Sequence, residues 1–575
     1  MAMENQEIAA LFAEMADYHE LQGDNPFRVR AYRNAARLIE DMPEPLREGV
    51  TRQDDLTELP GIGKELAEKI VEIVQTGKLQ ALERLRSSLP SCVPDLLALQ
   101  GLGPRKVKAL LDHLQITRLE DLEQAARNGK VRELPGFGAK TEASLLAAIQ
   151  RRLSTPTRFL RSRVAPLANE LMEALKKTGH VQQITVAGSF RRGRDTVGDL
   201  DLLAVSDHPS AVMQALVDRS EVAQVLLRGE TKTSVRLTMG LQVDLRLVPP
   251  ESFGAALQYF TGSQAHNIAT RRRAQLAGLK QNEYGIFRAE EQIAGATEEE
   301  VYQALQLPWI PPELREDRGE LALAEQGRLP NLIGPADIRG DLHNHSTWSD
   351  GAATLCEMAC AARKRGWEYL AITDHSKRLT VANGLDEHRL RLQLEQMEEV
   401  RAELEGFSLL SGSEVDILED GSLDLPDSIL RELDVVILSV HSKFNLSREK
   451  QTTRILRALD NPYITFLAHP TGRLLLTRDP YEVDMERVLE GIRARGCFVE
   501  CNLNPHRLDL DDRYLARAKA LGVPVVLNCD GHSVTDFQHH DDGIMQARRA
   551  GLEAGDVVNT ATITELRNRL RATKR

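Results

Sequence analysis

The spacing of apolar and polar residues divides the chain into regions that predict different secondary structure. Residues 1–150 follow the helical period throughout, beginning with the acidic stretch "MAMENQEIAALFAEMADYHE". Between residues 151 and 310, short runs such as "QITVAG", "DLDLLAV" and "QVDLRLV" predict strands among helices. Residues 311–340 are rich in Pro, Gly and charge, which predicts a linker with one short helix.

Residues 341–575 repeat a strand-then-helix rhythm. The strand candidates are "DLHNH", "YLAITDH", "SLLSGSEVD", "VVILSVH", "ITFLAHP", "CFVECN" and "VVLNCDGH". Nearly all of them end in His, Asp or Glu, and functional groups of a parallel β/α barrel sit at the C-terminal ends of its strands. About seven strands favour a (β/α)7-type barrel over an open sheet.

Length and composition are those of a soluble protein with several domains. The 575 residues can bury several cores, and 42% hydrophobic and 27% charged residues are ordinary values. The chain has no run of about 18 apolar residues, so we expect no membrane span. The N-terminus is unlike a signal peptide, and six scattered cysteines without a Cys-x-x-Cys pair fit a reducing cytosol. We expect a cytoplasmic monomer.

The charge is distributed unevenly along the chain. A net charge of -12 argues against a nucleic-acid binder, yet residues 151–250 hold 15 basic and 10 acidic side chains. Residues 341–575 hold 30 basic and 38 acidic side chains, and ten of the fifteen histidines lie beyond residue 340. Because local patches steer a polyanion, the net charge does not exclude DNA as a partner.

Three segments of the helical region resemble one another, namely "LPGIGKELAEKI", "LQGLGPRKVKAL" and "LPGFGAKTEASLLAAI". Each has a Gly-x-Gly turn before an amphipathic helix, so backbone N–H groups can point at a phosphate. The glycines are Gly61, Gly63, Gly101, Gly103, Gly136 and Gly138. One copy would indicate an ordinary helix connection. Three copies, two of them followed by Lys or Arg, favour helix-hairpin-helix binding to the DNA backbone.

A second motif is "AGSFRRGRDTVGDLDLLAV". On a strand, Asp199 and Asp201 share a face, and "QVDLRLV" adds Asp244. Carboxylates completed by substrate phosphates suit Mg²⁺, and two such ions can activate an attacking oxygen and stabilise a leaving pyrophosphate. Gly188 and Ser189 could cradle phosphate, which Arg192 would neutralise.

Surface carboxylates at a strand end would explain a lone Asp-x-Asp. The Gly-Ser-x-x-Arg-Gly ahead of Gly-Asp-x-Asp, with a third strand aspartate, favours nucleotidyl transfer instead.

A third constellation lies in the barrel region. His343 and His345 form a His-x-His pair that places both imidazoles on one face of a strand end. The other ligand-type residues are Asp350, His375, Glu414, His441, His469, Asp530 and His532. A lone histidine is usually an ordinary polar residue, but nine such residues at successive strand ends predict a metal centre. Mixed His and carboxylate ligands suit two or three Zn²⁺ or Mn²⁺ ions.

Two family resemblances follow from these motifs. "GSFRRG…GDLD", "VDLR" and "YFTGSQAHN" resemble a family X DNA polymerase, a relative of polymerase beta, over about residues 1–310. The barrel set resembles the polymerase-and-histidinol-phosphatase (PHP) domain, a metal-dependent phosphoesterase. This layout is that of the bacterial family X polymerases.

The polymerase resemblance implies roles for particular residues. Asp199, Asp201 and Asp244 would bind the two catalytic metals, Mg²⁺ or Mn²⁺, with Asp244 near the primer 3′-hydroxyl. Nucleotide-binding positions would be Arg158, Gly188, Ser189, Arg192, Gly198, Tyr259, Phe260, Gly262, Asn267 and Arg271. Tyr259 and Phe260 would lie against the sugar and base, and Asn267 and Arg271 would probe the minor groove.

The resemblance also implies a lysine that opens an abasic sugar through a Schiff base. Lys69 matches it by position, and Arg28 could bind the 5′-phosphate with Tyr32 nearby. Phe27 stands where polymerase beta has a histidine. An ordinary solvated helix lysine stays an equal alternative for Lys69.

The expected domains are a helical lyase-like and hairpin region (1–150), a nucleotidyltransferase palm (151–250), a thumb (251–310), a linker (311–340) and a PHP barrel (341–575). The resemblance implies a DNA repair polymerase that fills short gaps, acting on gapped or nicked DNA and dNTPs at the nucleoid. The barrel would be a 3′-5′ exonuclease, an abasic-site endonuclease or a 3′-phosphatase. The alternatives are a DNA-end-binding module with inactive sites and a small-molecule phosphatase in the barrel.

Overall fold

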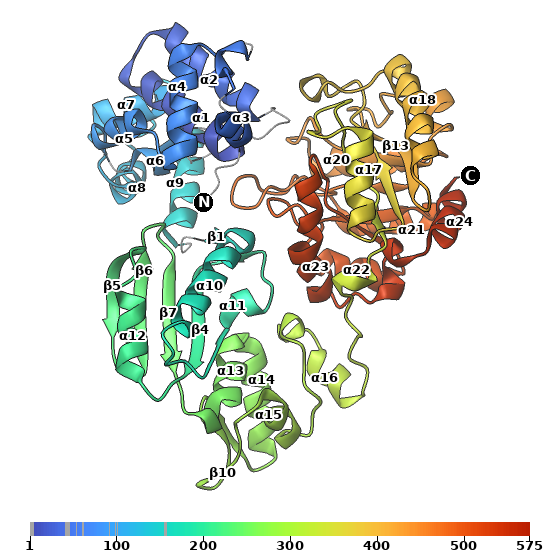
Figure 1. The fold of residues 1–575 in the computed structure, drawn as a ribbon. Coiled ribbons are helices and arrows are strands. Elements are labelled where there is room, and N and C mark those ends of the chain that lie inside the picture. The colour runs from blue at the N-terminus through green and yellow to red at the C-terminus, as the bar shows by residue number, and fades with distance from the viewer. Residues whose placement is uncertain are drawn as a thin grey trace. The chain divides into compact units, whose positions relative to one another are not determined.

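The computed structural model describes residues 5–574, except 41–45, 53, 60–61, 91, 98, 100–101 and 155–157. The chain forms two compact units, residues 1–156 and 157–575, which are described separately. Figure 1 shows both, coloured from blue at the N-terminus to red at the C-terminus. Among the described residues, no helix is both long enough and apolar enough to cross a membrane.

The first unit is helical, as its apolar period predicts. Its α-helices are α1 (Asn5–Gln22), α2 (Pro26–Glu40), α3 (Leu46–Arg52), α4 (Lys64–Thr76), α5 (Gln80–Ser87), α6 (Val93–Leu97), α7 (Pro104–Leu114), α8 (Leu119–Arg127) and α9 (Ala139–Ser154). Their apolar faces meet in one core that includes Phe12, Ile70 and Leu110, each with no exposed surface. Burial of these faces stabilises helices most of which are too short to persist alone.

The three Gly-x-Gly turns each precede a helix of this unit. Helices α4, α7 and α9 begin directly after Gly63, Gly103 and Gly138. Gly63 and Gly103 have nearly the same backbone, with φ/ψ of -83°/171° and -86°/171°. A Cβ atom at either would meet nothing within 4 Å, so the space before both helices is open. The predicted residues Gly61 and Gly101 lie outside the described residues.

The second unit begins with a five-stranded sheet in the order β2-β4-β7-β6-β5, in which β4 and β7 are parallel. Its elements are β1 (Phe159–Leu160), α10 (Arg161–Lys176), β2 (Gln183–Val186), α11 (Gly188–Arg191), β3 (Thr196–Val197), β4 (Asp199–Val205), α12 (Pro209–Val217), β5 (Val222–Arg228), β6 (Lys232–Leu237) and β7 (Gln242–Leu247). Helices α10 and α12 cover one face of the sheet (Figure 1). β1 pairs with β3 beside it.

Alternation along β4 sorts its side chains onto two faces. Leu200 and Leu202 are buried beneath α10 and α12. Leu203 and Val205 pack on the opposite face against the next helix, α13 (Phe253–Thr261). Asp199 and Asp201 share that opposite face by the two-residue strand period.

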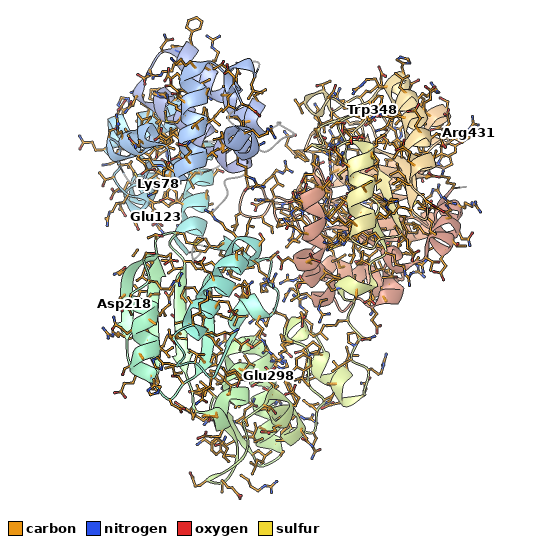
Figure 2. The ribbon with its side chains drawn as sticks, in the orientation of Figure 1. Lys78, Glu123, Asp218, Glu298, Trp348 and Arg431 are labelled. Atoms are coloured by element: carbon orange, nitrogen blue, oxygen red, sulfur yellow. The ribbon has the colours of Figure 1, made fainter. Side chains whose placement is uncertain are left out.

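Beyond the sheet lie α13, α14 (Gln264–Leu276), β8 (Lys280–Asn282), β9 (Gly285–Arg288), β10 (Glu291–Ala294) and α15 (Glu298–Ala304). Glu298, labelled in Figure 2, starts α15 and lies 2.7 Å from Arg191 Nη2 and 2.6 Å from Arg315 Nη1. Arg315 is fully buried, so these pairs supply the partner that its charge requires. Residues 311–340 contain α16 (Glu320–Glu325) between two short 3₁₀ turns.

The remaining residues form a nearly closed parallel barrel of seven strands, which confirms the predicted fold class. The strands are β11 (Gly340–Asp341), β12 (Tyr369–Ile372), β13 (Ser408–Asp416), β14 (Val435–Ser439), β15 (Phe466–Leu467), β16 (Phe498–Asn502) and β17 (Val525–Asn528), in chain order. A bridge between Asn344 and Gly531 joins the two ends of the sheet. The longer outer helices are α17 (Leu355–Lys364), α18 (Glu387–Glu403), α20 (Arg448–Leu459), α21 (Met485–Arg495), α22 (Asp512–Leu521), α23 (His539–Arg549) and α24 (Ile563–Thr573).

Two candidate metal centres

Three carboxylates lie on the face of the five-stranded sheet that is turned away from α10 and α12. Asp201 on β4 lies directly opposite Asp244 on β7, and Asp199 is two residues before Asp201. Burial raises the pKa of Asp201 to about 7, and the charges of Asp199 and Asp244 add to the effect. The negative charges of these carboxylates repel one another, and this repulsion opposes their ionisation. Bound divalent cations would remove the repulsion, so the group suits such ions.

A lysine and a glycine shape this carboxylate group. Lys232 Nζ lies 2.7 Å from Asp244 Oδ2, and Gln242 donates to Asp244 Oδ1 at 2.9 Å. Burial alone would raise the pKa of Asp244, but these hydrogen bonds outweigh it and lower the pKa. Gly188 has φ +61°, and a Cβ atom there would collide with the Asp201 carboxylate. Both the positive φ and the lack of space for a Cβ atom therefore require glycine at position 188.

Arg192, at the C-terminal end of α11, is held in place by two side-chain hydrogen bonds. Its Nε donates to Glu316 Oε1 at 3.1 Å, and its Nη1 donates to the carbonyl oxygen of Thr261 at 2.5 Å. Gly262 follows Thr261, and a Cβ atom on it would lie 3.2 Å from Arg192 Nη1. The structure thus brings the predicted Arg192 and Gly262 together.

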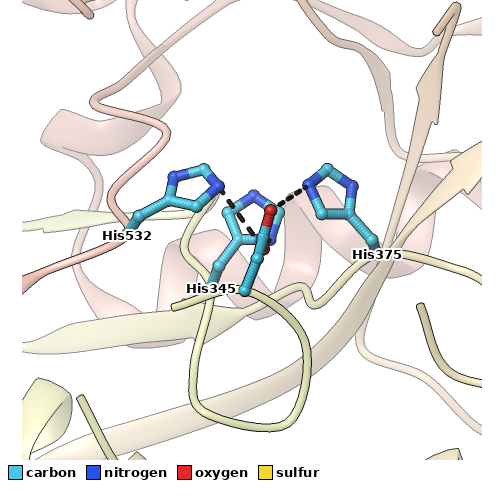
Figure 3. A group of neighbouring side chains, drawn as sticks. His345, His375 and His532 are labelled. Carbon is cyan, nitrogen blue, oxygen red and sulfur yellow. Dashed lines mark ion pairs between the residues drawn. The ribbon is translucent and has the colours of Figure 1, made fainter. Parts of the chain in front are cut away.

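The nine ligand-type residues of the barrel also converge. His345, His375 and His532 surround Asp350, with imidazole nitrogens 3.9, 3.5 and 3.5 Å from its carboxylate oxygens. Figure 3 shows the three imidazoles turned towards one another. The other predicted ligands found in groups that could hold metal ions are His343, Glu414, His441, His469 and Asp530. A further such group, formed by Asp341, Cys529 and His540, was not predicted from the sequence.

Glu414 lies at the centre of the nine. Its carboxylate oxygens are 2.8 Å from both His375 Nδ1 and His469 Nε2, and 3.3 Å from both His343 Nε2 and His441 Nε2. His345 Nε2 also lies 3.5 Å from Glu414 Oε2, and one carboxylate that five imidazoles approach is suited to bridge ions. The nine residues therefore lie close enough together to hold more than one ion.

The electrostatics of the barrel centre fit a cationic occupant. Among the described residues, His343 Nε2, His345 Nδ1 and Glu414 Oε2 are buried ligand-type atoms with no hydrogen-bond partner. Burial alone would lower the pKa of His441 and His532, but Glu414 beside the first and Asp350 beside the second raise each to about 10. Without a metal, protons on imidazole must balance the carboxylates, and metal ions are the usual replacement for such protons.

Comparison with known proteins gives the family. The chain matches models of a helix-hairpin-helix domain (residues 3–79), a SAM-like helix-hairpin-helix tandem (93–151), the DNA polymerase beta palm (158–253), the DNA polymerase beta thumb (256–316) and a PHP domain (341–503). It is 39% identical over 568 residues to the DNA polymerase/3′-5′ exonuclease PolX of Bacillus subtilis (strain 168), covering 98% of this chain and 99% of that protein. The chain belongs to the family X DNA polymerases that carry a PHP domain.

This family X polymerase has further relatives that align with only part of the chain. Probable phosphatases of Thermoanaerobacter sp. (strain X514) and Thermoanaerobacter pseudethanolicus (strain ATCC 33223 / 39E) are each 30% identical to it over 231 residues. These alignments cover 38% of this chain and 89% of each phosphatase. Asp530 and His532 lie beyond residue 503, where the PHP model match ends, yet the structure brings both to the centre.

Apart from Arg158, the other predicted nucleotide-binding residues of the family X polymerase lie on α11, α13 and α14 and between β3 and β4. The rings of Tyr259 and Phe260 are 5.1 Å apart, and the Arg271 guanidinium lies 6.0 Å from the Tyr259 ring. Asn267 donates to the Tyr259 carbonyl at 2.6 Å. Ser189 lies in α11 and Gly198 between β3 and β4.

Arg158 is held just before β1. Its Nε donates to Thr196 Oγ1 at 2.8 Å. Burial lowers the pKa of Arg158, as does the charge of Arg194 beside it.

Several residues that contact the predicted ligands of the barrel were not predicted from the sequence. Glu500 Oε1 lies 2.8 Å from His343 Nδ1, and Glu500 Oε2 accepts from the backbone N–H of His469 at 2.8 Å. Asp416 Oδ1 lies 3.0 Å from His441 Nδ1. Such partners fix the orientation of ligand imidazoles. Their signal was present, because both carboxylates lie at the ends of predicted strands. Lys232, whose partner is on another strand, had no such signal.

Lys69 lies in a small charged group of the helical unit. Its Nζ is 2.7 Å from Glu65 Oε1, which also lies 3.2 Å from Arg28 Nη2 and 3.4 Å from the Tyr32 hydroxyl. The structure therefore brings Lys69, Arg28 and Tyr32 together. Phe27 is 74% exposed and takes no part in these contacts.

Proposed function

We propose that this chain fills short gaps in DNA at the palm and removes nucleotides from 3′ ends at the barrel. The observation that supports the proposal is that one chain of this family carries two separate sets of ligand-type residues. Three carboxylates meet on β4 and β7, and nine His, Asp and Glu residues meet in the barrel. The polymerase and 3′-5′ exonuclease named for the Bacillus subtilis relative match these two centres.

The proposed domains are those expected from the sequence: 1–150, 151–250, 251–310, 311–340 and 341–575. In the palm, Asp199, Asp201 and Asp244 would hold Mg²⁺ or Mn²⁺. When bound, these ions would supply charge neutralisation and a more acidic primer hydroxyl. The residues of the chain would do the positioning: Arg192 and Ser189 bind the triphosphate, and Tyr259 and Phe260 lie against the sugar and base.

The barrel reaction we propose is hydrolysis of a phosphodiester at a DNA 3′ end. The imidazole-rich donor set suits Zn²⁺ or Mn²⁺, which would supply a nucleophilic water at neutral pH. Glu500 and Asp416 hold His343 and His441 in place. Arg507 Nε lies 3.5 Å from Asp530 Oδ2, where it could also meet a phosphate.

A second candidate reaction is favoured by one observation, the match of 231 residues of the chain to probable phosphatases. A PHP domain that removes a terminal phosphate would hydrolyse a 3′-phosphate or a small phosphomonoester. Comparing turnover of a DNA 3′-hydroxyl end, a DNA 3′-phosphate end and p-nitrophenyl phosphate separates these reactions. We expect the chain to be a monomer that is located in the cytoplasm and associated with the nucleoid.

The hairpin glycines give a prediction about DNA affinity. Replacing Gly63 and Gly103 by leucine should weaken binding to gapped DNA about tenfold, whatever its sequence, because the side chains fill the space where a phosphate meets the helix N–H groups. The fold should tolerate both changes, since the backbone angles suit any residue. Fluorescence anisotropy at about 50 and 200 mM salt measures this. Affinity that is unchanged in the variant, or flat with salt, would contradict hairpin binding.

Lys69 gives a prediction about abasic DNA. If it is the Schiff-base nucleophile, Lys69→Ala should lose the borohydride-trapped adduct with a 5′-deoxyribose phosphate end almost completely. Lys64→Ala is the matched control, because Lys64 lies on the same helix. Trapping that survives in Lys69→Ala and disappears in Lys64→Ala would transfer the role to Lys64.

A single assay tests the proposed function. A 5′-labelled primer bordering a one-nucleotide gap is incubated with Mn²⁺ or Mg²⁺, with and without dNTPs. We expect a product one nucleotide longer with dNTPs and shorter products without them. A chain that does neither in the presence of both ions is not the enzyme proposed here.

A further inference from the structure

The barrel contacts the palm at the loop that carries Arg192. A Cβ atom on Gly193 would lie 2.7 Å from Met545 Cε, so the glycine allows α23 of the barrel to approach closely. Arg161 Nη1 lies 3.3 Å from Asp542 Oδ1 on the same helix. On the other side, Arg473 Nη2 lies 3.4 Å from Asp195 Oδ2. The barrel therefore contacts this loop from more than one of its segments.

Arg549, the last residue of α23, joins this contact to Arg192. Its Nη1 donates to the Arg192 carbonyl at 2.8 Å and to Glu316 Oε1 at 3.0 Å. Its Nη2 donates to Asp512 Oδ2 at 2.7 Å. The side chain of Arg549 is 1% exposed, so its charge is compensated almost entirely by these partners.

Glu316 is shared between Arg549 and Arg192. Its Oε1 accepts from both guanidinium groups, at 3.0 and 3.1 Å. Burial alone would raise the pKa of Glu316, but the two arginines outweigh it and lower the pKa, so the carboxylate is ionised. The charge on Glu316 thus holds both arginines in fixed positions.

The two side-chain hydrogen bonds of Arg192 use only part of its guanidinium. Nε is engaged by Glu316 and Nη1 by the Thr261 carbonyl, and neither bond uses Nη2. Because Nε and Nη1 are both held, the plane of the guanidinium is fixed, and with it the direction in which Nη2 points. An arginine held in one plane binds phosphate without first losing side-chain freedom.

We propose that Arg549 of the barrel is a positioning residue for nucleotide binding at the palm, acting through Glu316 and through the Arg192 carbonyl. This rests on the proposed polymerase function and on Arg192 as a triphosphate-binding residue. It makes the PHP barrel part of the nucleotide site without contact between Arg549 and the nucleotide. The effect falls on nucleotide affinity, because the contact is equally present before and during the chemical step.

The test is single-turnover insertion of one nucleotide into a one-nucleotide gap by the full chain. Arg549→Met should raise the apparent Kd for the dNTP about tenfold and leave the maximal insertion rate within about twofold. The matched control is Arg548→Met. Arg548 is the neighbouring residue on α23 and binds Glu313 at 2.8 Å, three residues from Glu316. Its dNTP affinity should stay within about twofold of the wild type.

A second variant distinguishes loss of the Glu316 contacts from loss of the whole interface between the barrel and the palm. Glu316→Gln keeps the shape but weakens the bond to each arginine, and it should also raise the apparent Kd for the dNTP. Combined with Arg549→Met, it should add little, because both act on the same contact. Exonuclease activity of Arg549→Met reports that the barrel is folded.

The outcomes distinguish failure of the proposed function from failure of the proposed role of Arg549. A wild-type chain that inserts no nucleotide contradicts the proposed function. A wild type that inserts, together with Arg549→Met and Glu316→Gln variants of unchanged or tighter dNTP affinity, overturns the inference alone. Fully additive effects of the two substitutions would also overturn it, because they would act independently.

Discussion

Asp201→Asn should lower nucleotide incorporation about a thousandfold or more while the exonuclease continues. Asp201 stands between Asp199 and Asp244, so its carboxylate is placed to bind ions together with both. If Asp201 is a metal ligand as proposed, removing its charge removes that ligand and with it the stabilisation of the transferred phosphate. Single-turnover insertion into a gapped duplex measures the loss.

The folded state should not suffer from this change. Burial and the charges of its neighbours raise the pKa of Asp201 to about 7, so a neutral asparagine relieves repulsion in the absence of metal. We expect an unchanged or slightly higher Tm. Asp207→Asn, an exposed aspartate beyond the other end of β4, is the control and should insert nucleotides normally. Normal primer extension by Asp201→Asn would remove the palm centre from the account.

His343→Gln should lower hydrolysis of DNA 3′ ends about a hundredfold or more while gap filling continues. His343 has no exposed surface and lies 3.3 Å from Glu414 and 3.4 Å from Asp530. Losing one imidazole from a shared site lowers metal occupancy, and the activated water is lost with the metal. Glutamine keeps a polar group near Glu500, which limits the damage to the buried cluster.

The control and the metal requirement sharpen this second prediction. His388→Gln changes an exposed histidine on α18 and should leave hydrolysis intact. After chelation of the wild type, hydrolysis should return more readily with Mn²⁺ than with Mg²⁺, because Mg²⁺ prefers oxygen ligands and this set is rich in imidazole. Equal hydrolysis by His343→Gln and the wild type would place the reaction outside the barrel centre.

Local periodicity explains why so much of both centres could be predicted. The two-residue strand period places Asp199 and Asp201 on one face, and the end of each barrel strand faces the same opening. A ligand-type residue in the right place within a predicted element, such as Glu414, therefore indicates its spatial neighbours. The same rules predicted the helical first unit and the seven barrel strands.

Contacts between elements with no shared period could not be predicted in this way. The pairing of Lys232 with Asp244 depends on which strands are neighbours and in what register. Arg549 and Arg192 are separated by 357 residues, and nothing in either segment points to the other. Their contact exists only because α23 packs against the palm loop. Domain packing of this kind is decided by surfaces, which a single sequence does not display.

The central claim is that two independent centres of one chain act on the same DNA 3′ end. The most direct measurement uses a gapped duplex with a 5′-labelled primer that ends in a mismatch, incubated with dNTPs. The wild type should shorten the primer and then extend it; Asp201→Asn should only shorten it, and His343→Gln should leave the mismatch in place. A mixture of the two variants should restore shortening followed by extension. Failure of that mixture, with each variant active on its own substrate, would contradict independent centres that share one 3′ end.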